Sequence, residues 1–199
     1  MYALVEDGSI SKLITNPKAM VIGDVRYPAK IFQLWSQSEK ESIGIYEIVV
    51  DKTNYKDPEY YNNTDSSYSF ADGQVTESWG TATAKELEDR NATDKDGVEL
   101  DPIVVIDGLK TDMKRIIKQQ ASGLLEKTDW HNHKALDDET YTIPNDIKTY
   151  RANVRSKSNE METQIDACTN VDELKALYEY TTQEDGTQTR PLAEFPKEI

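Results

Sequence analysis

The fold of this chain is decided by residues 101–127, which read DPIVVIDGLKTDMKRIIKQQASGLLEK. Asp101 can accept hydrogen bonds from free amides, and Pro102 lacks the amide that has no partner at a first helical position, so this pair predicts a helix start. Apolar residues then recur at steps of three, four and seven, which places them on one face of a helix. They are Ile106, Leu109, Met113, Ile116, Ile117, Ala121, Leu124 and Leu125. We therefore expect a long amphipathic helix from Pro102 through Lys127.

A second and a third helix follow in the sequence. Residues 128–142, TDWHNHKALDDETYT, lose the helical period and predict a loop that turns the chain back. Pro144 and Asp146 then mark a new helix start, and Asn170 with Glu173 is similar to a capping box that opens a short third helix. Two amphipathic helices joined by a short loop pack antiparallel, so we expect a helical hairpin crossed by a third helix. The second apolar stripe is Ile147, Tyr150, Val154, Met161, Ile165 and Cys168, and the third is Val171, Leu174, Leu177 and Tyr178.

The N-terminal residues have the patterns of β-structure. Asp7-Gly8 and Asp72-Gly73 each separate two apolar-rich runs, and Asp-Gly accepts the positive φ angles of tight hairpin turns. Residues 44–50, GIYEIVV, form the strongest strand pattern, because β-branched and aromatic residues are enriched there. We expect a small antiparallel sheet of roughly three to five strands.

Together these patterns predict an α+β chain with four parts. A small antiparallel β-domain is expected over residues 1–81, and an acidic linker with a short helix over residues 82–101. A C-terminal antiparallel helical hairpin with its third short helix is expected over residues 102–180, followed by an extended tail over residues 181–199. The linker contains the charged, glycine-bearing run NATDKDGVEL at residues 91–100, which is typical of a connection.

Composition narrows the classes of partner. The chain has 199 residues with a formal net charge of −14, which repels a phosphate backbone, so no nucleic-acid partner is expected. No run approaches the length of a membrane span, so no membrane partner is expected either. Hydrophobic content is 37% and mean hydropathy is −0.73, which favours an extended shape or surfaces completed by partners. That shortage is also compatible with a homo-oligomer.

Cysteine usage and the N-terminus bear on the compartment. Cys168 is the only cysteine, so an internal disulfide is excluded and nothing indicates an oxidising compartment. The first residues, MYALVEDGSISKL, are acidic where a signal peptide is basic, and their apolar run is short. We expect a protein kept in a soluble, cytoplasm-like place.

Few residues are candidates for chemistry. His131 and His133, flanked by Asp129, Asp137 and Asp138, could hold a transition metal and serve a metal-dependent hydrolase. Their spacing fits no metal motif of defined geometry, so a polar loop that contains both histidines is the other reading. The sequence lacks a glycine-rich phosphate loop, GxSxG and HExxH. No catalytic residue, no metal and no cofactor is therefore expected.

Tyrosines form the one composition bias that suits contact surfaces. Tyr55, Tyr60, Tyr61 and Tyr68 all lie in one polar segment. Each ring contributes a large area with few rotatable bonds, as protein interfaces require. Ordinary packing at a sheet edge explains the same residues equally well.

One block of the sequence resembles a known family. Residues 124–130, LLEKTDW, are followed by Ile143-Pro144, by Tyr150-Arg151 and by Arg155. This order resembles the TDW…IP…YR pattern of bacteriophage tail-fibre assembly proteins and related small phage tail proteins. The layout of the N-terminal half, with MYALVEDGSI, GIYEIVV and FADGQVTESW, is similar too. The segment HNHKALDDETYT after TDW and the extension to residue 199 depart from the family pattern.

The resemblance implies a non-enzymatic viral tail protein that binds tail-fibre or baseplate subunits. It would be a retained structural component of the virion tail, present in the host cytoplasm during assembly. A transient tail-fibre assembly chaperone, absent from the mature particle, is the alternative within this class, and the hydrolase at His131 and His133 is the alternative from another class. The residues expected to contact the partner are Trp79, Trp130, Tyr150, Arg151 and Arg155.

Overall fold

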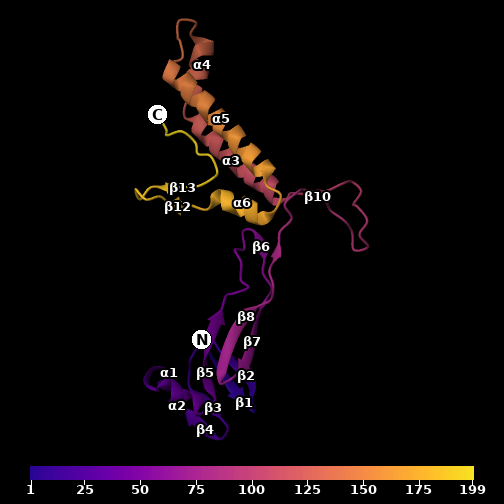
Figure 1. Ribbon diagram of the computed structural model, residues 1–199, viewed down its shortest axis with the longest axis vertical. Coiled ribbons are helices and arrows are strands. Elements are labelled where there is room, and N and C mark those ends of the chain that lie inside the picture. The colour runs from indigo at the N-terminus through magenta and orange to yellow at the C-terminus, as the bar shows by residue number, and fades with distance from the viewer. The chain divides into compact units, whose positions relative to one another are not determined.

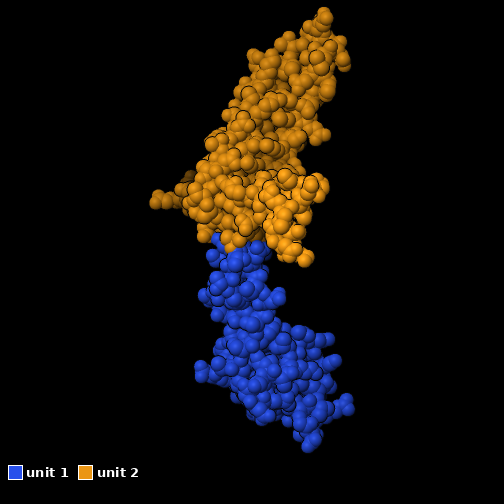
Figure 2. Space-filling view, turned by 90° about the vertical axis from the view of Figure 1, so that its right-hand side faces the viewer, with its two compact units in different colours: residues 1–83 blue, residues 84–199 orange.

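A computed structural model describes all 199 residues and contains both strands and helices, so the chain is α+β (Figure 1). It divides into two compact units, Met1–Thr83 and Ala84–Ile199 (Figure 2). Nearly all of the expected linker, residues 82–101, and all of the expected tail, residues 181–199, fall within the second unit.

The first unit is built on a five-stranded sheet in the order β2-β1-β5-β8-β7. Strands β1 and β2 pair antiparallel, as do β1 and β5, and β7 and β8. Strands β5 and β8 pair in parallel, so the expectation of a purely antiparallel sheet is wrong. The chain between them is long enough for a crossover, which a parallel neighbour requires. The strands are β1 (Tyr2–Glu6), β2 (Ser9–Ile14), β5 (Ile45–Asp51), β7 (Ser66–Ala71) and β8 (Gln74–Trp79).

Both Asp-Gly turns form as the sequence predicts. The φ angles are 50° and 74° at Asp7 and Gly8, and 50° and 77° at Asp72 and Gly73. Two consecutive positive φ angles are the signature of the hairpin turn whose twist matches that of the flanking strands. These turns set the register of β1 on β2 and of β7 on β8.

The sheet buries apolar side chains on both faces. Alternate residues of a strand point to opposite faces, so Ala3 packs on one face with Ile48 and Val75, whereas Leu4 packs on the other with Ile45. The second face is completed by Ile14, Ile31 and Phe32, and by Tyr2, Met20, Ile22, Tyr27, Trp35 and Ile43 around them. These residues come partly from β3 (Met20–Ile22), β4 (Val25–Tyr27) and α1 (Ile31–Leu34).

The remaining elements of the first unit are short. Helix α2 (Gln37–Glu41) begins with a capping box, in which the Ser36 side chain accepts from the Glu39 amide and the Glu39 carboxylate accepts from the Ser36 amide. Strands β6 (Tyr61–Asn62) and β9 (Thr83–Ala84) form a two-stranded ladder.

The second unit is organised by α3 (Leu109–Glu126) and α5 (Asn145–Ala167), which lie side by side (Figure 1). Lys114 near the start of α3 bonds Asp166 at the end of α5, and Arg151 near the start of α5 bonds the carbonyl of Leu125 at the end of α3. The two helices are therefore antiparallel. Helix α6 (Val171–Tyr178) follows, with the Asn170 side chain accepting from the Glu173 amide as expected from the sequence. None of the helices is long and apolar enough to cross a membrane.

Helix α3 begins at Leu109, so the expected start at Asp101-Pro102 is wrong. Residues 103–106 are extended, and strand β11 (Val105–Ile106) pairs with β10 (Arg90–Asn91). The amides of Leu109 and Lys110 donate to the carbonyls of Glu86 and Leu87. The chain before β10 therefore contacts the start of α3 through the carbonyls of Glu86 and Leu87. The short helix expected within residues 82–101 is absent.

The segment between α3 and α5 is not a plain loop, because α4 (Asp129–Asp137) lies within it. Only His131 of this helix is buried, so the residues lack the apolar stripe by which a helix is recognised in a sequence. The expectation of a continuous loop over residues 128–142 is therefore wrong.

Two further ribbons complete the second unit. Residues 90–106, which we call the β10–β11 arm, run out from β10 through a turn at Asp94–Gly97 and return in β11. Strands β12 (Thr181–Thr182) and β13 (Gln188–Thr189) pair in the C-terminal segment. Beyond them, Leu192 is fully buried and Phe195 packs against the cluster of Ala121, Tyr150 and Val154. Leu192 and Phe195 thus attach the C-terminal segment to the packed part of the second unit.

Candidate functional site

Four of the residues that carry the resemblance meet at one junction, where α3 ends and α5 begins. The Arg151 guanidinium donates to the Leu125 carbonyl at 2.8 Å, to Thr128 Oγ1 at 2.6 Å and to Asp129 Oδ1 at 2.7 Å. Thr128 Oγ1 in turn donates to the same Leu125 carbonyl at 2.9 Å. We call Leu125, Thr128, Asp129 and Arg151 the junction cluster. It joins residues that are more than twenty positions apart in the sequence.

The junction cluster provides hydrogen-bond donors for the C-terminal end of helix α3. The last carbonyls of a helix have no partner within it, and the Leu125 carbonyl here receives both Arg151 and Thr128. Arg151 is only 7% exposed, and a buried guanidinium is tolerated when its donors are bonded and its charge is paired. Asp129 provides that charge. The cluster therefore fixes the angle at which the chain turns from α3 into α4.

Trp130 follows the junction cluster and remains accessible. The residue is 54% exposed, and its ring stacks on the His131 ring with centroids 3.7 Å apart. His131 is buried, and its Nδ1 is hydrogen-bonded to the Tyr141 hydroxyl. The buried imidazole thus serves as a platform that holds an exposed indole in one orientation, which is what an aromatic contact residue at a protein interface requires.

The other residues expected to contact a partner lie in different environments. Tyr150 is buried with Ala121 and Val154, so a partner could reach it or Arg151 only if this packing opened. Arg155 is exposed and makes one long bond, of 3.5 Å, to the Arg151 carbonyl. Trp79 lies in the first unit, half-buried, with its ring edge-on to Tyr55 at 5.2 Å. Their roles in binding stay predictions.

The two histidines do not converge on a common ligand. Residues two positions apart on a helix point to nearly opposite sides, and here His131 is buried whereas His133 is exposed. No three or more His, Cys, Asp or Glu side chains are grouped so that they could hold a metal ion. The geometry gives no support to the hydrolase reading.

Cys168 is placed as a packing residue. The thiol is buried, and burial followed by the nearby Glu173 carboxylate raises its pKa. A raised pKa keeps the thiol protonated, and the thiolate is the nucleophilic form. Its Sγ lies 3.4 Å from the Gln164 carbonyl, where the thiol is a weak donor.

The tyrosine-rich segment packs largely within the protein. Tyr60 and Tyr61 are buried. The Tyr68 hydroxyl donates to Glu77 at 2.8 Å, and this bond raises the pKa of the phenol. The burial of Tyr60 and Tyr61 and the bond of Tyr68 favour packing within the sheet unit over a contact surface.

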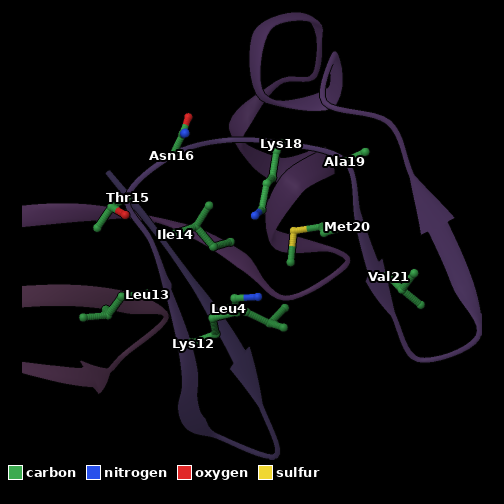
Figure 3. A pocket seen from close by; sticks show the side chains of 10 residues that line it. All are labelled: Leu4, Lys12, Leu13, Ile14, Thr15, Asn16, Lys18, Ala19, Met20 and Val21. Carbon is green, nitrogen blue, oxygen red and sulfur yellow. The ribbon is translucent and has the colours of Figure 1, made fainter.

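The first unit contains a pocket of about 340 Å³ beside β2 (Figure 3). Its apolar floor is formed by Leu4, Ile14 and Met20, and the side chains of Lys12 and Lys18 extend into it (Figure 3). Neither lysine forms an ion pair with a carboxylate of this chain. The pocket offers positive charge over apolar surface.

Asp89 and Gly108 shape the start of α3, and neither was predicted from the sequence. The Gly108 amide donates to Asp89 Oδ1 at 2.8 Å, and the Thr111 hydroxyl donates to Asp89 Oδ2 at 3.0 Å. These bonds hold the pKa of Asp89 below its usual range. A Cβ at Gly108 would lie 2.4 Å from the Glu88 carbonyl carbon, so only glycine fits. Asp89 stands nineteen positions before the amide that it caps, beyond the range of a local capping pattern.

Comparison with known proteins identifies no relative. No protein-family model, no curated protein and no solved structure matches the chain.

Proposed function

We propose that this chain is a non-enzymatic bacteriophage tail protein that binds tail-fibre or baseplate subunits and is retained in the virion tail. In this proposal the small β-sheet unit and the antiparallel hairpin of α3 and α5, with the short helix α6, are both docking elements. The host cytoplasm is the place of assembly, and neither a cofactor nor a nucleic acid takes part.

The observation that carries the proposal is the convergence of the TDW and YR residues. Arg151 donates directly to Thr128 and to Asp129, although nothing in their spacing along the chain requires it. The same junction presents Trp130 outward on a buried platform. The junction cluster therefore lies next to one exposed aromatic residue, Trp130. This supports a docking function, because aromatic anchors dominate interface energetics.

The test begins with mass spectrometry of purified virus particles. A fixed ratio of this chain to the fibre protein is the expected result for a retained tail component. If the chain is absent from particles but present in fibre complexes from infected-cell lysate, the transient chaperone replaces the first proposal. Absence from both samples overturns the tail function.

A variant pair tests whether Trp130 is the anchor. Trp130→Ala should weaken co-purification with the fibre or baseplate subunit by about tenfold or more, the usual effect of removing an interface hot spot. Leu136→Ala is the matched control, because Leu136 is 81% exposed on the same helix and about 120° away around its axis. Equal loss with both variants, or no loss with Trp130→Ala, would remove Trp130 from the interface.

A further inference from the structure

The β10–β11 arm exposes an unusual amount of apolar surface. Six of its side chains are between 37% and 63% exposed, in a chain whose hydrophobic content is only 37%. They are Val98, Leu100, Ile103, Val104, Val105 and Ile106. Exposed apolar residues scattered singly need no explanation, but a contiguous run of them marks an interaction surface.

The arm also carries an open strand edge. Strand β11 pairs with β10 alone, with Val105 opposite Asn91 and Ile106 opposite Arg90. The Ala92 amide donates to the Val104 carbonyl at 2.7 Å, which makes Asn91 and Val105 a pair without mutual hydrogen bonds. The N–H and C=O of Val105 therefore point away from β10, toward a side where no strand lies. Such an edge is a template for strand addition.

We propose that the β10–β11 arm is a self-association surface, in which β11 of one copy pairs antiparallel with β11 of a second copy around a two-fold axis. With Val105 opposite Val105 of the second copy, both residues can exchange their free N–H and C=O groups. Val104 then lies opposite Ile106, so β-branched side chains face each other, as stable cross-strand pairs do. This inference does not depend on the proposed tail function.

The charge distribution favours a second copy at this place. The chain carries a net charge of −14, so two copies repel each other in general, yet residues 102–106 carry no charge. The nearest carboxylate, Asp107, is bonded to Arg115 of its own chain at 2.6 Å. In the proposed register Asp107 lies opposite Ile103, so no two carboxylates face each other. A two-fold pair also covers both open edges with one contact.

Sedimentation velocity of the full chain over a concentration series tests the proposal. The expected species is a dimer of twice 22.6 kDa that dissociates on dilution. Val105→Pro should weaken the dimer about tenfold or more, because proline lacks the N–H that points away from β10. Val105→Thr keeps that donor and the β-branched shape, so it should retain the dimer. A wild-type chain that is monomeric at every concentration overturns the proposal, as does a dimer that Val105→Pro leaves unchanged.

Cross-linking provides a readout of the register that does not depend on the proline variant. Directly opposed residues that exchange hydrogen bonds have Cα atoms about 5.5 Å apart, within the range of a disulfide. Val105→Cys in a Cys168→Ala background should therefore give a covalent dimer on mild oxidation. Val98→Cys in the same background is the control, since Val98 is equally exposed but lies outside the β10–β11 ladder. Equal cross-linking by both cysteines would mean random collision and would overturn the proposed pairing.

Discussion

The two units differ in the residues that stabilise their turns and helix ends. In the first unit, the β1–β2 and β7–β8 hairpins turn on Asp7-Gly8 and Asp72-Gly73, which supply the required backbone angles by themselves. In the second unit, the start of α3 depends on Asp89, and the end of α3 depends on Arg151, each far away in the sequence. The comparison teaches that equally sharp bends can be encoded by adjacent residues or by a remote side chain. Substitutions at the two kinds of bend should differ in size.

The largest effect is expected at the junction cluster. Arg151→Ala removes the bonds to Leu125, Thr128 and Asp129 and should lower the free energy of unfolding of the second unit by about 2–4 kcal/mol. Urea denaturation followed by circular dichroism of the helices measures the change.

Arg155→Ala is the matched control for that substitution, since Arg155 is an exposed arginine one turn further along α5. Surface substitutions of this kind change stability by less than about 0.5 kcal/mol. Similar losses from Arg151→Ala and Arg155→Ala would show that the junction cluster does not hold the turn.

A glycine in each unit sharpens the comparison further. Gly108→Ala would place a Cβ within 2.7 Å of three backbone atoms of Leu87 and Glu88, so the start of α3 must shift, at a cost of about 1–3 kcal/mol. Gly73→Ala meets no atom within 4 Å and is strained only by its φ of +77°, which costs about 1 kcal/mol. Denaturation curves of both variants give the two values. A larger loss for Gly73→Ala would contradict the role of the remote contact at Gly108.

Helix α6 is the exception within the second unit, because its start is encoded locally. Asn170→Ala removes the acceptor of the Glu173 amide, at 2.9 Å, and should destabilise the unit by about 1 kcal/mol. Asn170→Asp retains an acceptor and should preserve stability. If Asn170→Asp lost as much stability as the alanine variant, the side-chain cap would not be the cause.

The smallest expected effect is the pH dependence of the stabilisation that Asp89 provides at the start of α3. Bonds from Gly108 and then Thr111 lower the pKa of Asp89 from its ordinary value of 3.8. A carboxyl whose pKa is lowered by folding stabilises the folded state above its unfolded pKa, and this contribution disappears as the pH falls through the folded pKa. The difference in unfolding free energy between wild type and Asp89→Asn should therefore be positive at neutral pH and shrink below pH 3.8.

Asp96→Asn is the control for this measurement, because the Asp96 carboxylate lies at the exposed turn of the β10–β11 arm and its ion pair is with the solvent-exposed Lys95. The same pH dependence in both variants would show that the effect is not specific to Asp89. If the difference in unfolding free energy between wild type and Asp89→Asn stayed constant in acid, the Asp89 charge would not stabilise the start of α3.

Particular elements show how much of the fold could be predicted from the sequence. The α5 stripe and the Asn170 cap are visible because their residues lie within one or two turns of each other, and Tyr150, Val154, Met161 and Ile165 are all buried as the period indicates. Helix α4 was missed because only His131 is buried along it. The Asp101-Pro102 start was wrong because a local signal competed with Glu86, Leu87 and Asp89, which occupy the α3 N-terminus from outside any local window.

At the candidate site, too, some residues could be identified from the sequence, whereas their contacts could not. Trp130 and Arg151 were identified by a resemblance, but neither spacing nor composition shows that Arg151 is buried on Thr128 while Trp130 faces outward. Asp89 and Gly108 had no signal in the sequence that could have found them. Residues 103–106 were expected in the first part of a helix, with Ile106 on its apolar stripe, whereas the structure places Val105 and Ile106 in a strand.

The sequence by itself determined the α+β class, both Asp-Gly hairpins and the capped start of α6, because each depends on torsional preferences and hydrogen bonds among neighbouring residues. Only the tertiary structure decided the parallel pairing of β5 with β8, the start of α3, the junction cluster and the open edge of β11. These depend on which distant groups compete for the same amides and carbonyls. That competition is settled by burial and hydrogen bonding in the whole unit, which no local pattern of residues records.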